Sequence, residues 1–515
     1  MTDAVAALLT RAQEIGVKLW VESGEIKYRC RADAVPRTFL DELGSHRAAL
    51  VRHLSDFGSE PSEDELTPPF ERKIPDSALV PSFRQATWHA CQNKLSGVDS
   101  TNLRFVVRVR GHLDFAALSF AFEEMRARHE VLKATVTEVE GRPWLVYGSQ
   151  AEWQVDARDT SHVAAGERED AARALTSDLV WAPMELATGP LFRAFVVTVD
   201  AENHILGFVV HHFISDALSM NMLGEELIRN YSFKMAGHRP PQAREALQYG
   251  DYLLSYAGWI ARPPVRVQLQ RWVDRLAEAA PMDLVNRPAQ PPTSDFACVR
   301  NQFEINAELT ATIELRAQQL HVSKFVLLLT VQKLLISCMT EQSKVTIGAV
   351  IPGRELPALA PIVGYLADRM HWTTDLDGDP DFAEAAGRVN SSYLEAMRYQ
   401  FFRSDIIQQE LNRRGKWMHA PVFNFVPFLR PRANSASDRF SSFALDPAPF
   451  STIPLPGISY WLSIIDMRHT MRGDIRFPHG SVEKLARQFL GTLEMVMRDR
   501  TARLSAVRRQ FSTWS

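Results

Sequence analysis

The sequence predicts a mixed α/β protein with more than one domain, and three observations support this prediction. The chain has 515 residues, too many for one ordinary hydrophobic core, so two to four domains are expected. Residues 205–210 form a short apolar run rich in β-branched residues, which is typical of a buried strand. Residues 114–125 place apolar side chains on one helical face behind Asp114, a good helix cap.

Net charge and cysteine spacing exclude several classes of protein. The formal net charge is -3, so no general attraction to nucleic acid or to anionic membranes follows. Cys30, Cys91, Cys298 and Cys338 form no CxxC pair, so we expect buried or free thiols in a reducing compartment. No apolar stretch is long enough to span a bilayer, and no signal peptide pattern is found. The sequence therefore predicts a cytoplasmic protein that binds neither nucleic acid nor membrane.

Residues 1–58 are expected to form a small separate module. Residues 2–16 predict a helix, and two more short helices are expected at 37–43 and 45–54. Residues 57–76 are rich in proline, serine and acidic residues and have little apolar periodicity, which predicts a linker.

A β-hairpin is predicted within this module. Residues 17–21 and 26–30 alternate with period two on either side of a Ser-Gly turn. The outer face has no obvious partner within the chain, and its basic and aromatic residues suit an acidic peptide that adds as a strand. The inner face would hold Val17, Leu19, Val21, Ile26, Tyr28 and Cys30, and the outer face Lys18, Trp20, Lys27 and Arg29.

The apolar run at 205–210 leads into two adjacent histidines and an acid. Side chains of neighbouring strand residues point to opposite faces, so only one of His211 and His212 can face a given cavity. A neutral imidazole held in one tautomer can accept a proton from an attacking amine or hydroxyl. Asp216 follows a short turn and would either orient the imidazole or pair with a cation.

Two other interpretations of these residues stay open. Both histidines can be core residues that are satisfied by backbone carbonyls. His and Asp are also metal ligands. However, no further His, Cys, Asp or Glu cluster stands at ligand spacing, so no metal is predicted.

The stretch His211–Ala217 resembles a known signature. It is similar to the HHxxxDG motif of condensation domains in nonribosomal peptide synthetases, which belong to the chloramphenicol acetyltransferase superfamily. Ala217 replaces the final glycine of that motif, and alanine disfavours a positive φ.

Further stretches resemble condensation domains in the family's order, over roughly residues 80–500. The family's HQDxPFE stretch is poorly kept, with Tyr399–Ser404 as its best candidate, and Asp368 stands where asparagine is usual. These weak C-terminal motifs suggest an acceptor other than the usual aminoacyl carrier protein. The better matches are Pro81–Trp88 (SxAQxRLW), Arg128–Thr135 (RHExLRT), Leu247–Tyr252 (YxDYA), Val345–Arg354 (VGxPxAGR), Ile362–Arg369 (IGxFVNT) and Pro421–Phe425.

The N-terminal module resembles the β-hairpin docking domains of assembly-line megasynthases, first recognised in the tubulysin system. Its helix, amphipathic hairpin and two helices stand just ahead of the condensation-like segment. The resemblance implies that Lys18, Trp20, Lys27 and Arg29 bind the C-terminal tail of an upstream acyl or peptidyl carrier protein. A helical extension that only packs on the main domain is the alternative.

The condensation resemblance implies the fold. Two α/β lobes of chloramphenicol acetyltransferase type would be set in a V, with the site in a tunnel between them. Arg262-Pro-Pro264 interrupts helical patterns, which places the lobe boundary near 255–275. The expected divisions are the docking domain 1–58, the linker 59–78, the N-lobe 79–265 and the C-lobe 266–515.

The same resemblance implies residue roles. His212 would be the catalytic imidazole, which either takes the acceptor's proton or positions the acceptor. His211 would face the other way and support the turn structurally. Asp216 would pair with Arg354 and fix the turn, and a backbone N–H after the motif would stabilise the oxyanion. No cofactor is expected beyond the phosphopantetheine thioester of the partner carrier protein.

The expected function is acyl transfer. A polyketide or peptidyl chain would pass from a carrier thioester to the amine or hydroxyl of a small molecule, forming an amide or ester and releasing the chain. No carrier, adenylation or thioesterase pattern follows Arg500, so we expect a stand-alone monomer similar to chain-releasing condensation enzymes of the enacyloxin type. An acyl-coenzyme A acyltransferase, an epimerisation-type domain and an inactive recruitment domain are the alternatives.

Overall fold

The computed structural model contains two compact units, Met1–Pro68 with Pro263–Gln268 and Pro69–Arg262 with Leu269–Ser515. The described residues are 8, 17–22, 25–30, 37–48, 50–51, 68–71, 102–139, 142–147, 153–240, 247–279, 282, 284, 299–354, 356–416, 420–426, 440–442, 460–477 and 482–513. The stretch Pro81–Trp88 and most of the predicted linker therefore lie outside the described residues, as does the predicted helix at 2–16 except for Leu8, which is helical.

The first unit contains the predicted hairpin. Strands β1 (Val17–Glu22) and β2 (Glu25–Cys30) are antiparallel, and α2 (Arg37–Ser45) follows them. The register pairs the four outer-face residues across the strands, Lys18 with Arg29 and Trp20 with Lys27. The buried apolar side chains described in this unit are Leu8, Leu19, Phe39, Leu43, Leu50 and Val265.

The register agrees with the predicted inner face for one pair, because Tyr28 stands opposite the buried Leu19. Tyr28 is nevertheless 46% exposed, because so small a unit covers only part of a hairpin face. On the outer face, for which no partner within the chain was expected, Lys27 donates from its Nζ to Glu25 Oε2 at 3.1 Å. Arg47 also lies 3.8 Å from the Glu25 carboxylate. Part of the basic charge of this unit is therefore already balanced.

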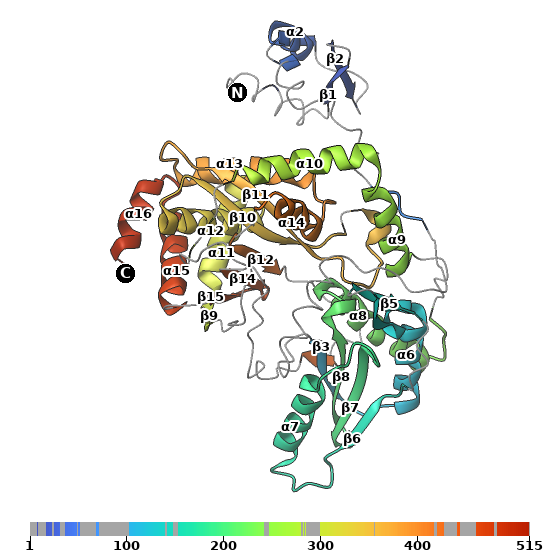
Figure 1. Cartoon of the computed structure of the whole chain (residues 1–515). Coiled ribbons are helices and arrows are strands. Elements are labelled where there is room, and N and C mark those ends of the chain that lie inside the picture. The colour runs from blue at the N-terminus through green and yellow to red at the C-terminus, as the bar shows by residue number, and fades with distance from the viewer. Residues whose placement is uncertain are drawn as a thin grey trace. The chain divides into compact units, whose positions relative to one another are not determined.

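The N-lobe of the second unit is built on a five-stranded sheet in the order β13-β3-β8-β7-β6 (Figure 1). Its central strand β8 is buried on both faces, which explains its continuous apolar run. Helices α6 and α8 pack together and α8 contacts β3, whereas α7 packs on β7. The strands are β3 (Asn102–Arg110), β6 (Asp156–Asp159), β7 (Phe192–Asp200), β8 (Asn203–His211) and β13 (Phe440–Ser442), and the helices are α6 (Phe115–Arg128), α7 (Arg168–Trp181) and α8 (Ala217–Met235).

Two local predictions for this lobe are confirmed and one feature was missed. Asp114 caps α6, because its Oδ1 accepts from the Ala117 N–H at 2.8 Å. The run at 205–210 lies within β8. The missed feature is β13, which comes from residues assigned to the C-lobe and pairs with β3. A small β-ribbon also follows α6, formed by β4 (Thr135–Val139) and β5 (Arg142–Val146).

The C-lobe is built on a six-stranded sheet in the order β11-β10-β12-β14-β15-β9. Strands β10, β12 and β14 are parallel, and the other neighbours are antiparallel. The helices α12, α13 and α15 pack against this sheet. The strands are β9 (Val299–Ile305), β10 (Lys344–Ile351), β11 (Asp368–Asp375), β12 (Val422–Val426), β14 (Trp461–Asp466) and β15 (Met471–Phe477), and the helices are α11 (Ala307–Gln319), α12 (Lys324–Thr340), α13 (Phe382–Met397), α14 (Ser404–Arg413), α15 (Val482–Arg498) and α16 (Leu504–Thr513).

Two helices lie in the chain between the two sheets. Helix α9 (Tyr249–Ile260) ends before Arg262, and α10 (Pro263–Ala277) begins at the first of the two prolines. The predicted interruption at this point is therefore confirmed. The lobe boundaries themselves stay predictions.

Within the described residues, no single helix has the length and apolar composition needed to cross a membrane. Helices α11 and α12, bent by 101° at their junction, meet those criteria only as a pair.

Candidate active site

His211 is the last residue of β8 and lies in the core. Its side chain is fully buried, and its Nδ1 accepts from the Phe213 N–H at 3.0 Å. Burial, with a smaller contribution from the neighbouring His212, lowers the pKa of His211 to about 3. The ring is therefore neutral at physiological pH and its Nδ1 is engaged in shaping the turn.

His212 begins a 3₁₀ turn, His212–Ile214, and is half-buried. Its Nδ1 lies 2.8 Å from the carbonyl oxygen of Ser215. A carbonyl can only accept a hydrogen bond, so Nδ1 carries the proton. In the neutral ring this leaves Nε2 as the basic nitrogen. The Tyr365 ring packs against this imidazole, with 4.8 Å between ring centroids.

Asp216 is the N-cap of α8 and is almost fully buried. Its Oδ1 accepts from the Ser219 N–H and hydroxyl, each at 2.9 Å. Its Oδ2 accepts from the N–H groups of Leu366 and Ala367, at 2.9 and 3.0 Å. Both carboxylate oxygens are thus used within the protein, so Asp216 does not orient the His212 ring directly.

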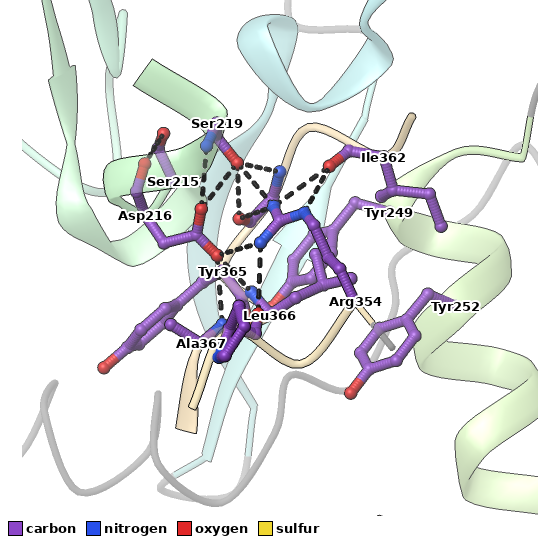
Figure 2. Close-up of polar contacts among 12 residues, drawn as sticks. Ser215, Asp216, Ser219, Tyr249, Tyr252, Arg354, Ile362, Tyr365, Leu366 and Ala367 are labelled. Carbon is purple, nitrogen blue, oxygen red and sulfur yellow. Dashed lines mark hydrogen bonds and ion pairs between the residues drawn. The ribbon is translucent and has the colours of Figure 1, made fainter. Parts of the chain in front are cut away.

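Arg354 supplies the counter-charge, as the sequence comparison with condensation domains implied. Its Nη1 lies 2.7 Å from Asp216 Oδ2, and both side chains are buried (Figure 2). Burial alone would raise the pKa of Asp216. The attraction of Arg354 and the hydrogen bonds from Arg354, Ser219 and Ala367 outweigh burial and hold that pKa below its usual value.

Ser219 joins the carboxylate to the loop of the C-lobe, and the motif comparison missed it. Its hydroxyl accepts from Arg354 Nη2 at 2.7 Å and from the Gly364 N–H at 3.0 Å (Figure 2). The guanidinium also donates to the carbonyl oxygen of Ile362 at 3.0 Å. Ser219 stands three residues after the N-cap Asp216, where its N–H reaches the capping carboxylate. Its role became visible only once Asp216 was seen to cap the helix.

Two glycines allow this close packing. Gly353 has a φ of +70°, and a Cβ there would lie 2.2 Å from the Leu366 carbonyl oxygen. A Cβ on Gly364 would lie 2.3 Å from the Tyr249 ring. Ala217, in contrast, begins the helix α8 and is not among the described residues with positive φ. The glycine usual at that point of the motif is therefore not required here.

Helix α9 supports the same loop from the other side. The Tyr249 hydroxyl donates to the Tyr365 carbonyl oxygen at 3.2 Å. The Tyr252 hydroxyl accepts from Arg403 Nη1 at 2.9 Å. Because Tyr249 and Tyr252 stand three residues apart, they share one face of the helix. This face thus contacts both the site loop and the segment before α14.

The other predicted site residues lie elsewhere. Lys18, Trp20, Lys27 and Arg29 belong to the hairpin of the first unit. Among the described residues, no group of three or more His, Cys, Asp and Glu side chains is arranged to hold a metal ion.

The chain belongs to the condensation domain family, because residues 82–508 match the Condensation domain. Members of this family catalyse amide or ester bond formation. Residues 5–56 match the TubC N-terminal docking domain, in agreement with the interpretation of the hairpin module.

Curated relatives are much longer synthases. A linear gramicidin synthase protein of Brevibacillus parabrevis is 27% identical over 390 residues, which cover 75% of this chain and 8% of that protein. Bacitracin synthase 3 of Bacillus licheniformis is 25% identical over 416 residues, which cover 79% of this chain and 6% of that protein. The chain thus spans less than a tenth of the length of these relatives.

Solved structures share the fold of two chloramphenicol acetyltransferase-like lobes. The structure that describes condensation domain-mediated chain release from the enacyloxin polyketide synthase matches with a TM-score of 0.69 and 21% identity, covering 97% of each chain. The X-domain from teicoplanin biosynthesis matches with a TM-score of 0.68 and 20% identity, covering 85% of this chain and 98% of that one. The predicted fold class is therefore confirmed.

Proposed function

We propose that this protein transfers an acyl chain from the phosphopantetheine thioester of a carrier protein to the amine or hydroxyl of a small-molecule acceptor. The product is an amide or an ester, and the chain leaves the carrier. The observation that carries this proposal is the single tautomer of His212, which the Ser215 carbonyl sets. Membership of the condensation domain family supports the reaction class.

In the proposed mechanism, Nε2 of His212 accepts the proton of the attacking amine or hydroxyl. The acceptor atom forms a bond to the thioester carbon, the C–S bond then breaks, and the proton passes to the leaving thiolate. General-base assistance of this kind contributes roughly 10²–10⁴-fold in rate. The Nδ1–H of His212 stays bonded to Ser215 throughout, so the imidazolium that forms is partly stabilised by that carbonyl.

Asp216 acts as a positioning residue in this mechanism. Its carboxylate caps α8 and binds Arg354, so it fixes where the turn 212–215 leaves the end of β8. Alignment of two substrates before reaction contributes up to about 7–11 kcal/mol to lowering a barrier. A rigid turn therefore serves both proton transfer and the placing of the acceptor beside the thioester, in the tunnel that we propose between the lobes.

The N-terminal module would recruit the carrier protein to the enzyme. The match of residues 5–56 to a docking domain supports recruitment of a carrier by its C-terminal tail. The hairpin offers a strand edge to which a peptide can add. Recruitment raises the local concentration of the acyl donor without altering the chemistry.

The test is intact mass spectrometry of an acyl-loaded carrier protein, incubated with the full-length enzyme and a panel of free amines and alcohols. We expect loss of the acyl mass from the carrier and appearance of an amide or ester of one acceptor class. Release of free acid alone, or unchanged carrier with every acceptor, would contradict the proposal. Acyl-coenzyme A as a parallel donor distinguishes a carrier-independent acyltransferase.

A further inference from the structure

One face of the C-lobe sheet carries a group of polar side chains on its last strands. Side chains of β10 alternate between the two faces of the sheet. Ile347 shares a face with its cross-strand partner Trp372, whose ring contacts Lys333 of α12 and Tyr393 of α13, so these helices pack on that face. Gly348 belongs to the opposite face, and so do the residues that stand beside it on the neighbouring strands, His371 and Val422. On the last strands this face carries Asn424, Trp461, Ser463, Asp474, Arg476 and Arg300.

Two arginines of this face share a single carboxylate. Arg300 Nε donates to Asp474 Oδ2 at 2.8 Å, and a second donor of the same guanidinium, Nη2, also reaches Oδ2. Arg476 Nε lies 3.4 Å from Asp474 Oδ1. Asp474 is buried, whereas both guanidinium groups are partly open to solvent, with side chains 20% and 30% exposed. One positive charge of this trio is left unbalanced.

A third arginine adds to this charge from the N-lobe. Arg104 lies on β3 and its Cζ is 4.4 Å from the centroid of the Trp181 ring. Surrounding protein, with a smaller effect of the Arg300 charge, lowers the pKa of Arg104 although its side chain reaches solvent. An arginine that is both exposed and desolvated is flanked by protein. The contribution of the Arg300 charge to this lowered pKa supports a position of Arg104 on the same side as Arg300, beside the measured contacts of the Arg300, Asp474 and Arg476 trio.

The excess of positive charge is found where Arg476 stands opposite Arg300, and not further along the same two strands. Arg472, four residues before Arg476 on the same face of β15, stands opposite Glu304 in the register and is exposed. Among the described residues, no acid forms an ion pair with Arg104. The described ion pairs therefore give Arg300 and Arg476 one buried carboxylate between them and give Arg104 none, and like charges held close together are costly unless an anion binds.

Arg104 lies close to the end of β8 that leads into the candidate active site. Asn102 stands opposite His211, and Arg104 follows two residues later on β3, about 7 Å further along the strand. Trp461 stands directly opposite Arg476, and its Nε1 donates to Ser463 Oγ at 2.6 Å. The half-buried indole gives the guanidinium pair an apolar neighbour, as is common where planar anionic groups bind.

We propose that Arg300, Arg476 and Arg104 bind an oxyanion carried by one of the two substrates. The shared chemistry is a carboxylate or phosphate held by guanidinium N–H groups, the geometry that arginine matches best. The oxyanion is either a carboxylate of the acceptor or the phosphate of the donor's phosphopantetheine arm. This proposal rests on the proposed function only for the identity of the substrates, because binding of the oxyanion can be measured without turnover.

Two variants test the site while Arg300, the closer partner of Asp474, stays in place. Arg476→Gln leaves both donors of Arg300 in place, and Arg104→Gln removes an exposed cation that has no described acid partner. The control is Arg472→Gln, which removes the same charge from the same strand face. Binding is measured by isothermal titration calorimetry on the full-length protein, with 3-hydroxybenzoate against 3-hydroxybenzamide and phosphopantetheine against pantetheine.

We expect the wild-type protein to bind either 3-hydroxybenzoate in preference to 3-hydroxybenzamide, or phosphopantetheine in preference to pantetheine. Arg476→Gln and Arg104→Gln should each weaken that binding roughly 10- to 100-fold, as for loss of a charged hydrogen bond, and Arg472→Gln by less than about threefold. Preference for the benzoate assigns the acceptor carboxylate, and preference for phosphopantetheine assigns the donor phosphate. Equal binding within both pairs, no binding of any probe, or equal effects of all three variants would overturn the proposal. Binding that behaves as expected without acyl transfer would count against the proposed function alone.

Discussion

Arg354 and Asp216 form a buried ion pair, with 2.7 Å between Nη1 and Oδ2, that joins the end of β10 in one lobe to the start of α8 in the other. The same guanidinium holds the carbonyl oxygen of Ile362. The turn that carries His212 is therefore fixed through Asp216 by Arg354, which stands 138 positions after Asp216 in the chain.

Asp216→Ala should destabilise the protein and slow acyl transfer. Removing one partner of a buried pair costs about 3–5 kcal/mol, because the remaining charge is left without compensation. Denaturant unfolding and single-turnover transfer measure the two effects. Asp381→Ala is the matched control, because Asp381 caps α13 through the same kind of hydrogen bond. Unlike Asp216, it is only half-buried, and it has no buried cation partner among the described residues. The control should lose only about 1 kcal/mol. Similar losses for both variants would show that the pair adds nothing to the cap.

Gly364→Ala should disturb the site through crowding. The added methyl group would lie 2.3 Å from the Tyr249 ring, on the loop that donates to Asp216. Overpacking of this kind costs about 1–3 kcal/mol. Gly387→Ala, in α13, has no atom within 4 Å of the new Cβ and should instead gain about 0.5–1 kcal/mol. Thermal unfolding of both variants checks this difference, and a Gly364→Ala protein as stable as the wild type would refute it.

Lys333 predicts a pH dependence of stability. Its side chain is fully buried, Nζ donates to the Val345 carbonyl oxygen at 3.0 Å, and burial lowers its pKa well below the usual value of 10.5. Below pH 10.5 and above the lowered pKa, the unfolded chain binds a proton that the folded protein does not. Stability therefore rises with pH in this window, by up to about 1.4 kcal/mol per pH unit. It falls as the pH drops towards the folded pKa.

Lys333→Met should remove that slope, because the apolar side chain has a similar length and no charge. Unfolding by guanidinium chloride at pH 7, 8 and 9 gives the difference between the two proteins. The variant's advantage should shrink as the pH rises. A constant difference across the three pH values would mean that Lys333 stays charged in the fold.

Removal of residues 1–58 should affect only donors that are attached to a carrier protein. We expect slower transfer from the acyl carrier and an unchanged rate from an acyl-pantetheine mimic. The double variant Lys18→Glu with Arg29→Glu, a cross-strand pair, should have the same effect within the intact chain. Exposed ion pairs contribute only about 0–1 kcal/mol each, so high salt should reduce the difference from wild type. Equal carrier-dependent rates for all three proteins would exclude a docking role.

The sequence was sufficient for the elements with strong local signals. The apolar run of β8, the hairpin and the Asp114 cap were all predicted correctly, because each depends on neighbouring residues. The pairing of β13 with β3 was not predicted, since strand order depends on contacts between residues far apart in the chain. The polar face around Asp474 was missed for the same reason.

The candidate site was predicted in part. The resemblance to condensation domains supplied His211, His212, Asp216 and Arg354. It did not supply Ser219, because a serine is common at the third position of a helix and its presence there does not predict contacts with a distant arginine. The proton position on His212 also required the structure, since it depends on where the Ser215 carbonyl points.

The most direct test is the single-turnover rate of acyl transfer by His212→Ala, compared with His211→Ala. Circular dichroism and unfolding curves must first show that both variants fold. We expect His212→Ala to lose roughly 10²–10⁴-fold in rate while it still binds the acyl carrier. We expect His211→Ala to lose stability, because its buried ring anchors the turn through the Phe213 N–H. A folded His212→Ala enzyme that transfers the acyl chain at the wild-type rate would contradict the assignment of His212 as the catalytic base.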